Sequence, residues 1–156
     1  MHPMLNIGIR AARAAGNVIV RNMDRIDRLQ IDQKGRNDFV SEVDHQAEAE
    51  IIQILKKAYP DHSILGEESG LTGAADNEYM WVVDPLDGTK NFLHGFPYFN
   101  VSIALKHNGR TTQGVVYNPV SQELFTATKG EGATLNNKRI RAVSYTHLTL
   151  PTTPYV

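Results

Sequence analysis

Apolar residues recur at helical spacing in two stretches near the start of the chain. Between residues 5 and 23 they return every three or four positions and leave a separate polar face, which is typical of an amphipathic helix. The apolar positions are Leu5, Ile9, Ala12, Gly16, Ile19 and Met23. This pattern predicts a helix over about residues 5–23 with one buried side.

A second helical pattern follows a polar segment at residues 33–38. It predicts a helix over about residues 41–59, ended by Pro60 because proline cannot continue a helix. Ser41 and Asp44 resemble a capping arrangement at its start. The apolar face comprises Val43, Ala47, Ile51, Ile54, Leu55 and Ala58.

After residue 60 the pattern changes to short apolar runs between turn residues, which is typical of β-strands. The expected strands are residues 63–66, 79–83, 101–106, 114–117 and 123–128, with two more short segments beyond them. Asn108 and Gly109 predict a tight hairpin between two of these strands. Two helices followed by an antiparallel meander predict an α+β domain, with both helices packed on one face of a largely antiparallel sheet.

The composition fits one packed domain. The 156 residues are 41% hydrophobic and carry a formal charge of -1, unlike a disordered tail. The balanced charge gives no long-range attraction to polyanions, so no direct nucleic-acid partner is expected. No run reaches the roughly 18 apolar residues of a membrane helix, and Arg10 and Arg13 interrupt any signal-peptide core. We therefore expect a soluble, cytoplasmic protein with no membrane partner.

The sequence contains no cysteine. This excludes disulfides, a thiolate nucleophile and every metal site that needs a thiolate. The six histidines show no paired spacing for metal binding. Any metal must therefore be held mainly by oxygen atoms.

The last residues depart from the pattern. Residues 145–156 contain four Thr, two Pro and no Asp, Glu, Lys or Arg, which suits an exposed, irregular segment. We therefore expect a folded part at residues 1–143 and an irregular tail at residues 144–156. A sequence-assembly scar fits the composition of this tail at least as well as native sequence.

Two acidic clusters follow expected strands: residues 66–69 (Gly-Glu-Glu-Ser) and residues 84–89 (Asp-Pro-Leu-Asp-Gly-Thr). In the second cluster, Asp84, Asp87 and the carbonyl of Leu86 offer three oxygen ligands within four residues, and oxygen is what Mg²⁺ prefers. Glu67 would add charge for more than one ion.

A short helix is expected at residues 90–94, directly after Gly88 and Thr89. Backbone N–H groups at a helix start bind phosphate, and glycine lets the backbone approach a ligand closely. Each cluster alone is also explained as an ordinary turn or a solvated strand end, because Asp, Pro and Gly are turn residues. Their combination favours a site for metal and phosphate.

Residues 81–94 resemble the signature of the inositol monophosphatase family, and residues 66–69 resemble its upstream metal-binding motif. The resemblance extends from the first helix to about residue 141, including residues 38–41 with Asp44 and residues 130–133. It implies the first half of a layered αβαβα phosphatase fold and a phosphorylated small-molecule substrate, with a homodimer in intact relatives.

The resemblance also implies roles for individual residues. Glu67, Asp84 and the Leu86 carbonyl would hold one Mg²⁺ ion, and Asp84 with Asp87 a second. Glu67 and Thr89 would orient or deprotonate the attacking water, with Asp44 near Thr89. The substrate side would comprise Leu86, Asp87, Gly88 and Thr89, with the Gly88 and Thr89 amides on the phosphate.

Lys34 has two interpretations. A lysine in this region lies near the metal site in the family, but a lone lysine in a polar loop is usually solvated.

The chain also departs from the family pattern. Family members are roughly twice as long, and their second half carries a Trp-Asp motif whose Asp is a further metal ligand. No Trp-Asp pair occurs after residue 94. We therefore expect a first metal site but severely reduced phosphatase activity.

Two alternatives remain beside a Mg²⁺-dependent phosphomonoesterase for inositol 1-phosphate or a related polyol phosphate. The first is a non-catalytic interaction protein, because bacterial members resembling this chain are associated with transcription machinery and ribosomal RNA maturation. The second is a related phosphatase for bisphosphorylated nucleotides or fructose bisphosphate. The metal motif does not distinguish these substrates.

Overall fold

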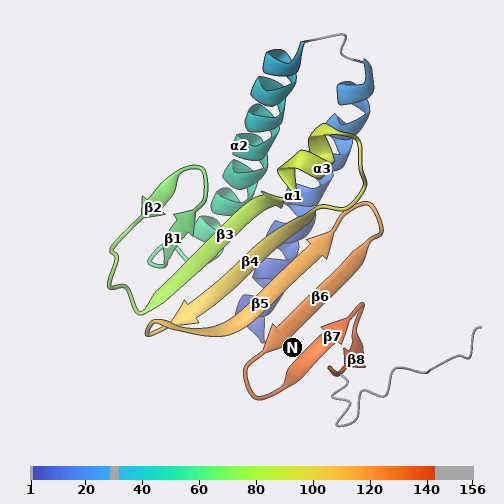
Figure 1. Cartoon of the computed structure of the whole chain (residues 1–156). Helices are drawn as coiled ribbons and strands as arrows, with labels where there is room; N and C mark the ends of the chain where they lie inside the picture. Colours follow the sequence, from blue (N-terminus) through green and yellow to red (C-terminus); the bar gives the residue numbers. More distant parts are fainter. Residues whose placement is uncertain (1, 29–31, 143–156) are drawn as a thin grey trace, which may run out of the picture.

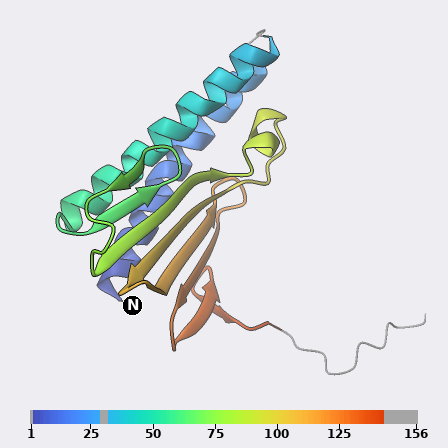
Figure 2. The same ribbon diagram turned by 60° about the vertical axis from the view of Figure 1, so that its left-hand side comes forward.

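Two long helices lie side by side across one face of a single sheet (Figure 1, Figure 2). The computed structural model describes residues 2–28 and 32–142, so the expected tail at residues 144–156 lies outside the described residues. Helix α1 (Pro3–Arg28) packs on β4 and β5, and helix α2 (Gln33–Ala58) packs on α1 and β3. None of the described helices is long and apolar enough to span a bilayer.

The sheet has eight strands in the order β2-β1-β3-β4-β5-β6-β7-β8. Their bounds are β1 (Ser63–Gly66), β2 (Gly70–Thr72), β3 (Tyr79–Asp87), β4 (Asn100–His107), β5 (Arg110–Asn118), β6 (Glu123–Thr128), β7 (Gly132–Leu135) and β8 (Lys138–Ile140). Strands β1 and β3 pair in parallel, and the other neighbouring pairs are antiparallel. The expected α+β architecture is therefore confirmed.

The core fills the space between the helices and the sheet. Helix α1 contributes the buried residues Ala11, Ala12, Ala15 and Ile19 to this core. Gly16 belongs to this face because a Cβ there would lie 2.8 Å from Tyr117 and 2.9 Å from Pro119. The absent side chain lets α1 lie close to β5, which explains a glycine in an apolar stripe.

The expected start of the second helix is wrong by two turns. Helix α2 begins at Gln33, and its cap is Asp32, whose side chain accepts a hydrogen bond from the Gly35 N–H at 2.8 Å. Ser41 lies inside the helix and caps nothing. The first residues of α2 are mostly exposed, so this part of the helix carries no apolar stripe that could reveal it.

The segment after Val83 also differs from the expectation of a turn. Strand β3 continues through Pro85 to Asp87, with a register irregularity against β4 between Asp84 and Asp87. Proline lacks the N–H of a regular strand ladder, so it is tolerated where pairing is irregular. The Asn108–Gly109 hairpin is confirmed, with positive φ of 48° and 76° at its two residues.

Candidate active site

The two acidic clusters meet because β1 and β3 run in parallel. Their register pairs Gly66 with Val83, and the Glu67 N–H donates to the Val83 carbonyl at 3.1 Å. Glu67 and Asp84 are the next residues of the two strands, so they emerge at the same edge of the sheet. The expected convergence of these two residues is present.

Asp84 lies among other carboxylates. Burial raises its pKa to about 7, together with a hydrogen bond to Glu67 and the negative charges of Glu67 and Asp87. The Leu86 N–H donates to Asp84 Oδ1 at 3.1 Å, and this hydrogen bond lowers the pKa of Asp84 in part. At neutral pH this carboxyl group is therefore near its midpoint of ionisation unless a cation is present.

Helix α2 brings Asp44 to the same place. Asp44 is only 5% exposed, and its Oδ1 has no hydrogen-bond partner among the described residues. Burial raises its pKa to about 8, helped by the charges of Glu68, Asp84 and Glu67 and by a hydrogen bond with Glu68. An unpaired buried carboxylate oxygen is costly, so this site is poised to accept a proton or a cation.

A cavity of about 310 Å³ opens between α2, the β1–β2 turn and helix α3 (Thr89–Leu93). Its lining residues are Asn37, Val40, Ser41, Asp44, Glu67, Glu68, Thr89, Lys90 and Leu93. The cavity therefore gathers three carboxylates, one cationic side chain and the hydroxyl of Thr89.

The short helix is present, but it begins at Thr89. Gly88 precedes it with φ of 94°, and a Cβ there would lie 3.1 Å from the Tyr98 carbonyl and 3.3 Å from Phe99 Cα. Both the backbone conformation and the space therefore require glycine. The Thr89 hydroxyl donates to the Leu86 carbonyl at 3.0 Å, which fixes the hydroxyl beside the acidic cluster.

Four of the predicted site residues do not line the cavity: Asp84, Leu86, Asp87 and Gly88. Asp87 is exposed and lies outside the cavity lining, although its charge acts on Asp84. The Leu86 side chain is buried, so only its backbone carbonyl is available to a ligand. Lys34 is exposed in the first turn of α2 and does not line the cavity.

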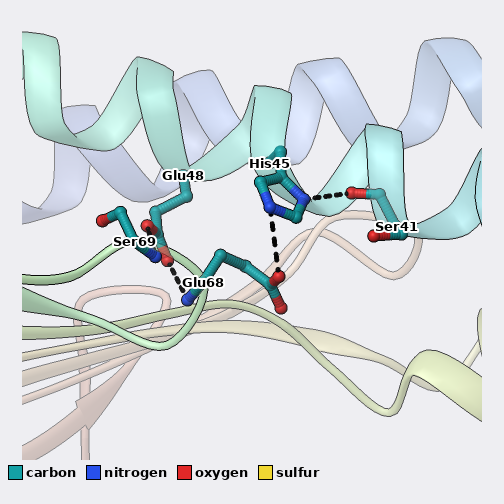
Figure 3. Close-up of polar contacts among 5 residues, drawn as sticks. All are labelled: Ser41, His45, Glu48, Glu68 and Ser69. Carbon is teal, nitrogen blue, oxygen red and sulfur yellow. Dashed lines mark hydrogen bonds and ion pairs between the residues drawn. The ribbon is translucent and has the colours of Figure 1, made fainter.

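Sequence reasoning missed Glu48. This residue is 2% exposed, and its carboxylate accepts hydrogen bonds from the Glu68 and Ser69 N–H groups, both at 2.8 Å (Figure 3). The available signal was an acidic residue four positions after Asp44, beside the apolar positions Ala47 and Ile51. Such a residue on the buried side of a helix needs a partner.

The carboxylates near Asp84 are few enough to distinguish a complete metal cage from a partial one. Within residues 2–28 and 32–142, no three His, Asp or Glu side chains are gathered to hold one ion by themselves. However, Mg²⁺ is usually bound by one or two carboxylates together with water and substrate phosphate. The structure offers such a pair in Glu67 and Asp84, and a cation would relieve the burial and repulsion that raise the pKa of Asp84. The residues present therefore fit the ion.

Known proteins are similar to this chain in sequence and in fold. The model of the inositol monophosphatase family matches residues 1–153. The Nus factor SuhB of Haemophilus influenzae is 55% identical over 144 residues, which are 92% of this chain and 54% of that protein.

Two solved structures are similar over the same part. The extragenic suppressor protein SuhB of Bartonella henselae is 44% identical with a TM-score of 0.82, over 92% of this chain and 56% of that chain. The inositol monophosphatase of Anabaena is 40% identical with a TM-score of 0.79, over 91% of this chain and 50% of that chain. The chain spans about half the length of these relatives. On this sequence and structural evidence, the chain belongs to the inositol monophosphatase family.

Proposed function

We propose that residues 1–143 form the metal-binding half of a Mg²⁺-dependent phosphomonoesterase. The substrate would be inositol 1-phosphate or a related polyol phosphate. The observation that carries the proposal is the meeting of Glu67 and Asp84 at one sheet edge, beside the buried carboxyl group of Asp44. Like charges held together in this way serve no packing purpose, and they suit a bound cation.

The chain supplies ligands for two ions. Glu67, Asp84 and the Leu86 carbonyl would hold the first, and Asp84 with Asp87 the second. When bound, such ions lower the pKa of a water molecule and neutralise charge on the phosphate. Asp87 is exposed beside Asp84, so its oxygen atoms are accessible from solvent.

Other residues would orient the reacting groups. The Thr89 hydroxyl donates a hydrogen bond to the Leu86 carbonyl, so its lone pairs are left to accept a hydrogen bond from water. Glu67 lines the same cavity and would accept the water's proton. The Gly88 and Thr89 amides would bind phosphate oxygens. Asp44 lines the same cavity as Thr89 and would add a carboxyl group near the attacking water.

Phosphate release from inositol 1-phosphate tests this proposal. We expect slow release by this chain that requires Mg²⁺, and much faster release by a relative of full family length measured in parallel. Asp84→Asn should abolish the Mg²⁺-dependent part, whereas Asp76→Asn, at an exposed position before β3, should not. Release that is unaffected by Mg²⁺ or by Asp84→Asn would contradict the proposal.

A second candidate function follows from the relatives that are called Nus factors and are 55% identical to this chain. In that case the chain would bind components of the transcription machinery, and its carboxylate site would be dispensable. Metal-independent capture of purified transcription components, unchanged by Asp84→Asn and without phosphate release, would favour this function over the first.

The substrate could also be a bisphosphorylated nucleotide or fructose bisphosphate. Parallel assays with these compounds would rank them against inositol 1-phosphate. If kcat/KM is higher for a bisphosphate, that compound becomes the proposed substrate in place of inositol 1-phosphate. The proposed metal chemistry is the same for both.

A further inference from the structure

We propose that Glu48 is a positioning residue that holds the metal-binding turn at residues 67–69 against α2. The inference rests on the proposed function, because that function makes the direction of the Glu67 carboxylate important. Glu48 does not line the cavity, so it would act through the turn rather than as a ligand.

The contacts of Glu48 are directed at the backbone of the turn. Its Oε2 accepts from the Glu68 N–H and its Oε1 accepts from the Ser69 N–H, each at 2.8 Å. Figure 3 shows Glu48 projecting from α2 to these two amides, with His45 of the same helix near the Glu68 carboxylate. A carboxylate that accepts two backbone N–H groups makes charge-assisted hydrogen bonds, which are stronger than neutral ones.

Three consecutive amides of the turn are therefore fixed. The Glu67 N–H is bound by the Val83 carbonyl through the β1–β3 pairing, and the next two are bound by Glu48. The sheet thus holds one side of the turn, and Glu48 of α2 binds the backbone on the other. His45 of α2 also contacts the turn, at 3.5 Å, but it reaches the Glu68 side chain rather than the backbone. Without Glu48, the backbone beside Glu67 would lose its hydrogen bonds to α2.

Gly66 is matched to this arrangement. A Cβ at Gly66 would lie 2.5 Å from Glu48 Oε1 and 2.7 Å from its carboxyl carbon. Gly66 is not among the positive-φ glycines, so its backbone conformation does not require glycine. The approach of the Glu48 carboxylate requires it instead.

Glu48 and Asp44 differ although they lie one helical turn apart on the buried side of α2. Asp44 lines the cavity and leaves Oδ1 without a partner among the described residues, whereas both oxygens of Glu48 are engaged by backbone N–H groups. The helix therefore presents the carboxyl group of Asp44 to the cavity. It presents the carboxylate of Glu48 to the turn that carries Glu67.

The test is the affinity of the chain for Mn²⁺, measured by calorimetry well below the unfolding temperature. Glu48→Gln keeps the size of the side chain but places an NH₂ group against a backbone N–H. Loss of such an outer contact typically weakens metal binding by about 10-fold to 100-fold, and we expect at least about 10-fold. Glu50→Gln, on the exposed side of the same helix, is the matched control and should bind as tightly as the unmodified chain.

Gly66→Ala provides a second route to the same effect. It leaves Glu48 in the sequence but displaces its carboxylate, so we expect a similar weakening of Mn²⁺ binding. The double variant Glu48→Gln with Gly66→Ala should be little weaker than either single variant, because both remove the same contact. Hydrogen exchange at the Glu68 and Ser69 amides should accelerate in each variant.

The outcomes separate this inference from the proposed function. If the unmodified chain binds Mn²⁺ and Glu48→Gln binds it equally well despite faster exchange at Glu68 and Ser69, the positioning role is wrong and the metal site stands. If the unmodified chain binds no divalent cation, the proposed function fails and the inference fails with it. A merely structural role for Glu48 would lower the unfolding temperature without changing Mn²⁺ affinity.

Discussion

The two ends of strand β3 carry opposite kinds of side-chain cluster. At its start, a column of nearly parallel rings stacks at centroid distances of 4.6, 4.8 and 4.5 Å, in the order Tyr59, His62, Tyr79 and His107. Trp81 lies beside the column and donates its indole N–H to His62 Nδ1 at 3.1 Å. At the other end, Asp84 faces carboxyl groups that repel it.

The cluster at the start of β3 is built for stability, whereas the cluster at its end is suited to binding. In the column the rings pack on each other, and the buried Trp81 finds a partner for its only polar atom. At the acidic end, burial and like charge both disfavour the ionised state of Asp44 and Asp84. A protein retains such a cluster at a cost to its own stability, which is typical of functional sites.

Removal of Trp81 should give the largest loss of stability. The side chain is 2% exposed, and truncation of a buried aromatic ring to alanine typically costs about 3–5 kcal/mol. Urea denaturation of Trp81→Ala should show a loss in this range. A loss below about 1 kcal/mol, a typical value for an average substitution, would show that burial of the Trp81 ring does not stabilise this end of the sheet.

Asp84→Asn should have the opposite effect on stability and a strong effect on binding. Asparagine is neutral, so the repulsion disappears and the metal-free protein should melt about 2–4 °C higher at pH 8. Mg²⁺ affinity should fall by at least about 10-fold, and by more than in Glu68→Gln, because Glu68 is not an assigned ligand. Equal losses of affinity in the two variants, measured by calorimetry, would contradict the assignment of ligands.

The metal-free protein should lose stability as the pH rises from about 4 to about 8. Asp44 ionises near 3.8 when unfolded, but its pKa is raised to about 8 when folded, so the unfolded state releases its proton first and gains stability relative to the folded state. Asp44→Asn should flatten this decline in urea midpoints recorded in EDTA. An unchanged slope would show that Asp44 does not carry the effect.

The ring column should respond to pH in the other direction, with a smaller effect. Burial lowers the pKa of His62 below its ordinary value of 6.5, so the unfolded state takes up a proton first as the pH falls below 6.5. His62→Gln should therefore lose less stability than the unmodified chain between pH 6.5 and pH 5. A variant that loses as much would show that the neutral form of His62 is not what the column requires.

The sequence allowed much of the fold to be predicted, because periodic apolar patterns mark α1, the buried part of α2 and most strands. Strand β2 has only three residues and no buried pattern, so nothing local reveals it. The exposed start of α2 was missed for the same reason. Its extra turns place Asn37 in the lining of the cavity.

The residues of the proposed site were chosen by their types, whereas the geometry that brings them together depends on long-range pairing. Glu67 and Asp84 lie side by side because Gly66 pairs with Val83 in the sheet. No local sequence pattern encodes this register. The role of Glu48 depends on contacts with residues 20 and 21 positions away. Such contacts are determined by how the elements pack rather than by spacing along the chain.

The most direct test of the metal site is calorimetric titration of Mg²⁺ into the chain at pH 7, in two buffers with different ionisation enthalpies. At this pH and without a cation, Asp84, with a pKa of about 7, is about half protonated, and the neighbouring Asp44, with a pKa of about 8, is mostly protonated. Metal binding to Asp84 displaces its proton, and the positive charge of the ion favours loss of the proton on Asp44. We therefore predict binding with a net release of protons. Binding with the same enthalpy in both buffers, or no binding, would contradict the claim that Asp84 holds a cation beside Asp44.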